Sequence, residues 1–184
     1  MANVPNYTVA NISIGPGVVY LGVAGTTPTT DIGAISTDGL ELNLTQEYLE
    51  VFQGSPKQLI TQFKTSETLE VKITGIEWNL MSLPIALGAG VTTSSGTQDV
   101  FSFGGDPTTT ALAAKIVHTM PSGHTINIYM WRTNISGSWN IKMAQDTLHS
   151  FPYTFKALVA TVAWDGVTAL ASGSQLFRIV RQKA

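Results

Sequence analysis

The sequence predicts a mainly β fold, a β-sandwich or barrel with one flanking α-helix and a long protruding loop. Apolar and polar residues alternate along several segments, which is the period of a half-buried strand. Clusters of Gly, Pro and Ser separate these segments, as turns do. With 184 residues that are 43% hydrophobic, the chain can build a sizeable core, and we expect a single domain over residues 1–184.

Two strands are predicted in the first half of the chain. Leucines alternate with polar residues over 40–45, directly after the turn signal Asp38-Gly39. Apolar residues alternate with Thr, Glu and Lys over 68–73 in the same way. Each segment therefore has one face for the core and one polar face.

A hairpin and two further strands are predicted in the second half. Segments 114–120 and 124–132 flank the turn Pro121-Ser122-Gly123, which indicates a β-hairpin. An aromatic and apolar stripe over 151–159 predicts another strand, and residues 176–181 predict a closing strand.

One segment, residues 75–87, predicts a helix. Thr74 and Glu77 have the spacing of a capping box, and Gly88 is a natural stop. Pro84 lacks the amide hydrogen that a helix interior needs, so it should shorten or bend the last turn. Segments 25–35, 92–96 and 104–110 are predicted to be loops.

Segment 47–60 is too long for a hairpin turn and is predicted to be the protruding loop. It carries four large apolar residues, Tyr48, Leu49, Val51 and Phe52. An exposed side chain of this size forgoes about 1.5–3 kcal/mol of burial, so something should cover it. Two hypotheses remain open on the loop alone: the loop docks on another subunit, or it folds back and caps its own core.

Charge is sparse and unevenly distributed. Only 12% of residues are charged and the net charge is −2, which argues against a general affinity for nucleic acid or anionic membranes. Residues 1–92 hold eight acidic and three basic residues, whereas residues 93–184 hold four acidic and seven basic ones. An apolar chain with oppositely charged halves suits head-to-tail self-assembly better than a twofold dimer.

No constellation of residues points to catalysis, a cofactor or a metal. The chain has no cysteine, and His118, His124 and His149 lack the spacing of a metal pair or a nucleophilic triad. His118 and His124 flank the predicted hairpin turn and are interpreted as a surface pair. Aromatic residues at strand spacing could form a stacking platform for sugars or bases, but core or subunit packing is the commoner role. They are Tyr129, Trp131, Trp139, Phe151 and Tyr153.

The order of elements over residues 31–90 resembles that of the major tail tube proteins of tailed bacteriophages, whose fold is shared with the tube protein of type VI secretion. The order is the turn Asp38-Gly39, the strand LELNLTQE, the apolar and acidic loop EYLEVFQGSPKQ, the strands LITQFKT and TLEVKIT, and the helix IEWNLMSLPIALG. The later hairpin, the aromatic strand SFPYTFKALVAT and the closing strand LFRIVRQ fit the remainder.

The resemblance implies a structural virion protein and no enzyme. Such a subunit would form hexameric rings that stack into a hollow tube, the conduit for DNA delivery to the host. The long loop would reach a neighbouring subunit or ring, which makes Tyr48, Leu49, Val51 and Phe52 the expected inter-subunit contacts.

The expected partners are other copies of the chain, further tail proteins such as the tape measure, terminator and tip, and genome DNA bound without sequence specificity. No membrane and no cofactor are expected. The protein would be made in the host cytoplasm and reside in the virion tail.

We expect a neutral to acidic lumen, because each cation bound to a phosphate would slow sliding DNA. Glu41, Glu67 and Glu70 are the candidates, since the alternation predicts that they lie on polar faces of strands. The alternative function is a glycan- or receptor-binding β-sandwich of a virion or cell surface, which would be a monomer or trimer. A small β-rich hydrolase is a third hypothesis.

Overall fold

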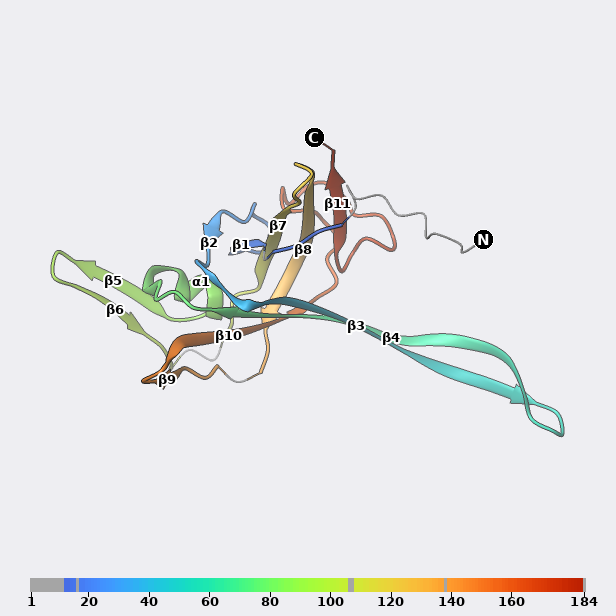
Figure 1. Ribbon diagram of the computed structural model, residues 1–184. Coiled ribbons are helices and arrows are strands. Elements are labelled where there is room, and N and C mark those ends of the chain that lie inside the picture. Colours follow the sequence, from blue (N-terminus) through green and yellow to red (C-terminus); the bar gives the residue numbers. More distant parts are fainter. Residues whose placement is uncertain (1–11, 16, 106–107, 138, 184) are drawn as a thin grey trace, which may run out of the picture.

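The structure, a computed structural model, describes residues 12–15, 17–105, 108–137 and 139–183 (Figure 1). Strands dominate, as predicted, and in these described residues the helical structure is a 3-10 turn, Leu80–Ser82, and a short helix, α1 (Leu83–Leu87). The strands are β1 (Val18–Val23), β2 (Thr30–Asp31), β3 (Ile35–Gln53), β4 (Gln58–Gly75), β5 (Val91–Ser95), β6 (Gln98–Ser102), β7 (Leu112–Thr119), β8 (Thr125–Ile135), β9 (Lys142–Ala144), β10 (Thr147–Ala157) and β11 (Arg178–Gln182).

Most strands join one antiparallel sheet in the order β2-β1-β7-β8-β10-β4-β3. Along one edge β8 pairs with β7, and along its other edge it pairs first with β11 and then, over residues 133–135, with β10. The sheet divides at this point into two wings, β2-β1-β7-β8 and β10-β4-β3, which cross steeply in Figure 1. The result is the sandwich-like β arrangement that the sequence predicts.

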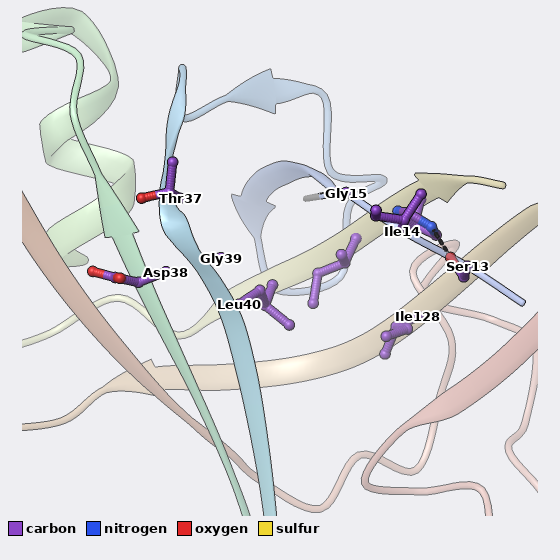
Figure 2. A pocket seen from close by; sticks show the side chains of 11 residues that line it. Ser13, Ile14, Gly15, Thr37, Asp38, Gly39, Leu40 and Ile128 are labelled. Carbon is purple, nitrogen blue, oxygen red and sulfur yellow. Dashed lines mark hydrogen bonds between the residues drawn. The ribbon is translucent and has the colours of Figure 1, made fainter. Parts of the chain in front are cut away.

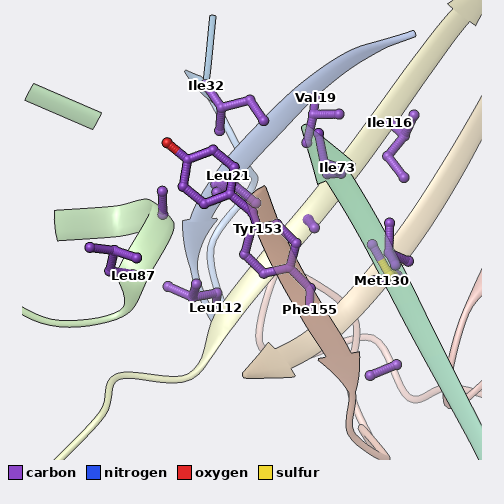
Figure 3. Close-up of a cluster of buried hydrophobic side chains, with 14 of the residues drawn as sticks. Val19, Leu21, Ile32, Ile73, Leu87, Leu112, Ile116, Met130, Tyr153 and Phe155 are labelled. Atoms are coloured by element: carbon purple, nitrogen blue, oxygen red, sulfur yellow. The ribbon is translucent and has the colours of Figure 1, made fainter. Parts of the chain in front are cut away.

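The hydrophobic core lies between the two wings and is closed by α1. Figure 3 shows Tyr153 and Phe155 of β10 beside Leu21 of β1 and Leu112 of β7. Further core side chains come from β4, β7, β8 and α1, and include Leu69, Val71, Ile73, Ile116, Met130, Leu83, Ala86 and Leu87. The alternation over 68–73 is confirmed, since Leu69, Val71 and Ile73 are all buried.

The predicted helix over 75–87 is wrong in its first half. Gly75 still belongs to β4, where it pairs with Phe151 of β10, so the chain stays extended there. The capping box does not form, because the Glu77 carboxylate instead accepts a hydrogen bond of 2.9 Å from the Ala34 amide. Helix α1 begins only at Leu83, and Pro84 lies at its first turn, where a missing amide hydrogen costs nothing.

The prediction of a loop over 47–60 is also wrong, because most of the segment is strand. The segment does protrude, as predicted. β3 and β4 continue their pairing as far as Gln53 and Gln58, so a long two-stranded ribbon leaves the body and turns at residues 54–57. In Figure 1 this ribbon extends to one side, far beyond the other strands. The two strands pair the backbone groups on their inner edges with each other, and the groups on their outer edges face water, so the ribbon can project without help from the body.

The remaining predictions are mostly confirmed, with one further correction. The hairpin about residues 121–123 is present as β7 and β8, and the closing strand is β11. The 151–159 stripe lies in β10 as far as Ala157, whereas Val159 follows the strand and is exposed. Segment 92–96 is not a loop: Val91–Ser95 pairs with Gln98–Ser102, and Phe101 of that hairpin packs against the core. Segment 25–35 contains the two-residue strand β2, and residues 106–107 of the third predicted loop lie outside the described residues.

Candidate assembly surface

The projecting ribbon is the most unusual surface of the molecule. Every residue from 44 to 65 is exposed, on both strands and at the turn. We define the proximal ribbon as residues 40–46 and 67–73, and the distal ribbon as residues 47–66. The distal ribbon exposes seven large apolar side chains: Tyr48, Leu49, Val51, Phe52, Leu59, Ile60 and Phe63.

The pairing register assigns these side chains to two faces. Leu44, Tyr48 and Phe52 alternate along the side of β3 that carries the core leucines, and Phe52 pairs with Leu59. This core-side face is therefore the outward continuation of the hydrophobic core.

The opposite face changes character along the ribbon. In the proximal ribbon it is polar, with Glu41 opposite Lys72 and Asn43 opposite Glu70. In the distal ribbon it becomes apolar, because Leu49 pairs with Phe63 and Val51 follows on the same side. The distal ribbon thus presents apolar side chains in both directions.

Two irregularities in register lie within this segment. The pairing shifts between Glu47 and Tyr48 and again between Val51 and Phe52, which leaves Thr65 and Ile60 without a directly opposite residue. Such bulges bend and twist a strand pair locally. They therefore set the direction in which the distal side chains point.

A polar network holds the strands together at the junction of the two halves. The Lys64 ammonium lies 2.8 Å from Glu67 Oε2, and the Gln46 amide donates to Glu67 Oε1 at 2.9 Å. The Tyr48 hydroxyl donates to Gln46 Oε1 at 2.8 Å. The hydrogen bond from Lys64, with that from Gln46, holds the pKa of Glu67 below its usual value, and the same contact raises the pKa of Lys64.

The structure excludes one of the two hypotheses for the predicted contact residues, and docking on another subunit stays a prediction. Tyr48, Leu49, Val51 and Phe52 do not cap their own core: Leu49 is 58% exposed and Phe52 is 50% exposed. The sequence prediction did not include three further exposed apolar residues on β4: Leu59, which pairs with Phe52, Phe63, which pairs with Leu49, and Ile60 between them. Their apolar character is visible in the sequence. The pairing that places them beside β3 is visible only in the structure.

The three lumen candidates do not share one surface. Glu41 and Glu70 lie on the face of the sheet that points away from the core, near Lys72 and next to Lys156 of β10, which pairs with Glu70. Glu67 pairs with Gln46 and lies on the core-side face, held by Lys64. The alternation over 68–73 puts residue 67 on the apolar side, so its polar character alone was misleading.

A shallow pocket of about 540 Å³ opens where the N-terminal segment crosses β3, β7 and β8 (Figure 2). Ser13 and His118 are hydrogen-bonded there through Oγ and Nε2. Asp38 also lines this pocket, but in Figure 2 its carboxylate points away from Ser13. Ser13, His118 and Asp38 therefore do not form a nucleophilic triad.

The other two histidines, His124 and His149, make hydrogen bonds within the fold. The backbone of His124 accepts a hydrogen bond from the Met120 amide in the β7–β8 turn. His149 accepts one at Nδ1 from the Trp78 indole, 3.2 Å away. Within the described residues no three His, Asp or Glu side chains are close enough together to hold a metal ion.

The aromatic residues do not form a stacking platform. Phe151 and Tyr153 are buried in the core, and Trp139 stacks on Phe151. Tyr129 and Trp131 contact Trp164 edge to face, with ring centroids 5.0 and 5.1 Å away, so they anchor the segment before β11. The burial of Tyr153 raises its pKa to about 12.

A mainly β body with an uncovered, two-faced apolar ribbon defines a protein that associates with other chains. The comparison with protein families makes this specific: the chain belongs to the phage tail tube protein family, whose model matches residues 14–168. It is thus a structural component of a virion tail, as the resemblance implied. No helix among the described residues has the length and apolar character to span a bilayer.

The chain is less similar to individual known proteins than to the family model. No curated protein sequence matches the chain. Among solved structures, the chain is similar to a chain of the tail of an empty GTA particle with C6 symmetry. That likeness has a TM-score of 0.48 at 9% identity, and it covers 78% of this chain and 92% of the other.

Proposed function

We propose that this protein self-assembles into hexameric rings that stack into the hollow tail tube through which DNA reaches the host. Membership of the tail tube family supports a tube as the assembly, and the uncovered distal ribbon supports a contact between subunits. The ribbon is the single observation that carries the proposal. A monomer in water gains nothing by holding Leu49, Phe52 and Phe63 away from its own hydrophobic core.

The ribbon contacts neighbouring subunits through Tyr48, Leu49, Val51 and Phe52, together with Leu59 and Phe63. Because both of its faces are apolar, one flat contact would leave half of these side chains in water. Each distal ribbon is therefore covered from two sides, either by two subunits or by two surfaces of one.

The polar face of the proximal ribbon is the candidate lumen surface. Glu41 and Glu70 share it with Lys72 and Lys156, so these four charges balance and offer sliding DNA no net positive charge. Glu67 lies on the other side of the ribbon and is better placed for a subunit contact. A structure of the assembled tube with a lumen dominated by Lys and Arg would contradict this assignment.

The remaining partners follow from the role of a tube. Tape measure, terminator and tip proteins would meet its interior and its two ends, and genome DNA would pass without sequence-specific binding. Assembly from subunits made in the host cytoplasm needs no cofactor, metal or catalysis.

Negative-stain electron microscopy of the purified protein tests the proposal directly. We expect rings or tubes with sixfold symmetry in top views, and sedimentation that depends on protein concentration. Only monomers or trimers at high concentration, with and without salt, would refute the tube and favour a receptor-binding module instead.

A further inference from the structure

A second apolar surface lies at the end of the molecule opposite the ribbon. In Figure 1, α1, the β5–β6 hairpin and β9 gather at one end and the ribbon tip lies at the other. We call the end formed by α1, the β5–β6 hairpin and β9 the acceptor end. It exposes large apolar side chains from five segments: Trp78, Met81, Phe103, Met143 and Leu148.

The acceptor end contains a pocket. It measures about 420 Å³ and is lined by Leu87 of α1, Phe103 after β6, Ile135 at the end of β8, and Gly137 and Trp139 after β8. Its lining is almost wholly apolar, and its volume suits one or two large apolar side chains. Such a hollow is the complement of a projecting aromatic and aliphatic pair.

The two surfaces cannot meet within one molecule, because they lie at opposite ends of the same rigid body (Figure 1). A contact between them must therefore join two copies, head to tail. A heterologous contact of this kind repeats from copy to copy and generates rings or filaments. A tube is an assembly of that type.

The charges of the two surfaces are complementary. Between Glu50 and Lys64 the ribbon has one charged residue, Lys57, at its tip. Residues 73–114, which supply α1 and the β5–β6 hairpin, contain Glu77, Asp99 and Asp106 and no Lys or Arg. The positive tip is thus attracted to the acidic segments that supply α1 and the β5–β6 hairpin. At the same end β9 carries Lys142, and Asp146 follows it with the opposite charge.

We propose that the Phe52 and Leu59 pair at the end of the ribbon docks in the Leu87–Trp139 pocket of a second copy. This rests on the proposed tube function and names the partner surface within it. The pocket belongs to the next subunit along the head-to-tail contact, and Phe103 is the acceptor side chain that the ribbon covers.

The absence of cysteine allows a direct test by cross-linking. Ser55→Cys at the ribbon tip and Asn140→Cys beside Trp139 are combined in one chain, assembled, and treated with a short bis-maleimide. We expect a covalent ladder that extends to the hexamer. The matched control combines Ser55→Cys with Thr119→Cys, an exposed position in the β7–β8 turn, and should give no ladder.

A double-mutant cycle gives an independent readout that needs no cross-link. Phe52→Ala and Phe103→Ala should each raise the critical concentration for assembly about tenfold or more, and together little more than either alone. Phe52→Ala with Val167→Ala, which removes an exposed apolar side chain elsewhere, should give additive effects. Tubes that form without the ladder, or additive effects of Phe52 and Phe103, would overturn the docking site and leave the tube function standing. A protein that never assembles would refute both.

Discussion

The proximal and distal halves of one hairpin show how differently the same two strands can be used. In the proximal ribbon Leu69 and Val71 are buried in the hydrophobic core, and the other face is polar. In the distal ribbon Leu59 continues the same side of β4, yet nothing covers it. The pairing of β3 with β4 runs through both halves, with bulges at Glu47/Tyr48 and Val51/Phe52, and in the proximal half β4 also pairs with β10. What differs most is the cover of the side chains: the protomer's own core covers those of the proximal half, and nothing in the protomer covers those of the distal half.

The largest effect should come from a matched pair of leucines on β4. Leu69→Ala removes a side chain that is 1% exposed and should cost about 2–5 kcal/mol of folding stability through lost burial and a cavity. Leu59→Ala, at a position that is 48% exposed, should leave the melting temperature of the monomer nearly unchanged and weaken assembly. Thermal melting and a tube-formation assay on both variants measure the contrast. Equal losses of melting temperature would mean that the two halves are not distinct.

The next largest effect concerns assembly alone. Leu49→Ala combined with Phe52→Ala truncates one anchor on each face of the distal ribbon and should cost assembly about 2 kcal/mol or more. The monomer should keep its circular dichroism spectrum and its melting temperature, because both side chains are exposed in it. A large loss of melting temperature with tubes still forming would show that the ribbon serves the protomer's own fold.

A smaller effect, confined to high pH, should appear in the proximal core. Tyr153 pairs with Ile73 of β4, and burial raises its pKa from 10.0 to about 12. A raised folded-state pKa contributes stability that is complete below pH 10 and is lost as the pH rises toward 12. Tyr153→Phe should therefore reduce the fall in melting temperature between pH 10 and 12. A pH profile identical to that of the parent protein would show that Tyr153 does not titrate on unfolding.

The smallest effect should come from the junction between the halves. Glu67→Gln removes the ion pair with Lys64, an exposed contact that solvent screens. Because the folded-state pKa of Glu67 is lowered, its contribution is present above the unfolded value of 4.5 and is lost as the pH falls below it. We expect a slight decrease in melting temperature at neutral pH and none at low pH. A decrease that persists at low pH would point to packing and not to charge.

Prediction from sequence succeeded where the signal was local alternation. The signals for three elements are local in the sequence. Apolar and polar residues alternate over 40–45 and 68–73, and turn residues separate β7 from β8. The fold class and the main strands rest on these signals. The choice of Tyr48, Leu49, Val51 and Phe52 as contact candidates rests on their size and apolar character in a long segment, and it stays a prediction. Prediction failed where distant pairing decided the conformation: Gly75 remains extended because Phe151, far along the chain, pairs with it.

The sequence by itself determined the β period, the low charge and an excess of apolar residues that one protomer cannot bury, because these depend only on which side chains occur and in what order. Only the tertiary structure decided that segment 47–60 is a paired ribbon and that Glu67 lies apart from Glu41 and Glu70. It also decided that the acceptor pocket forms from α1, the end of β6 and the end of β8. The physical reason is the same in each case. Strand register and the closure of a pocket join residues that are far apart in the chain, and no local pattern encodes which of them will meet.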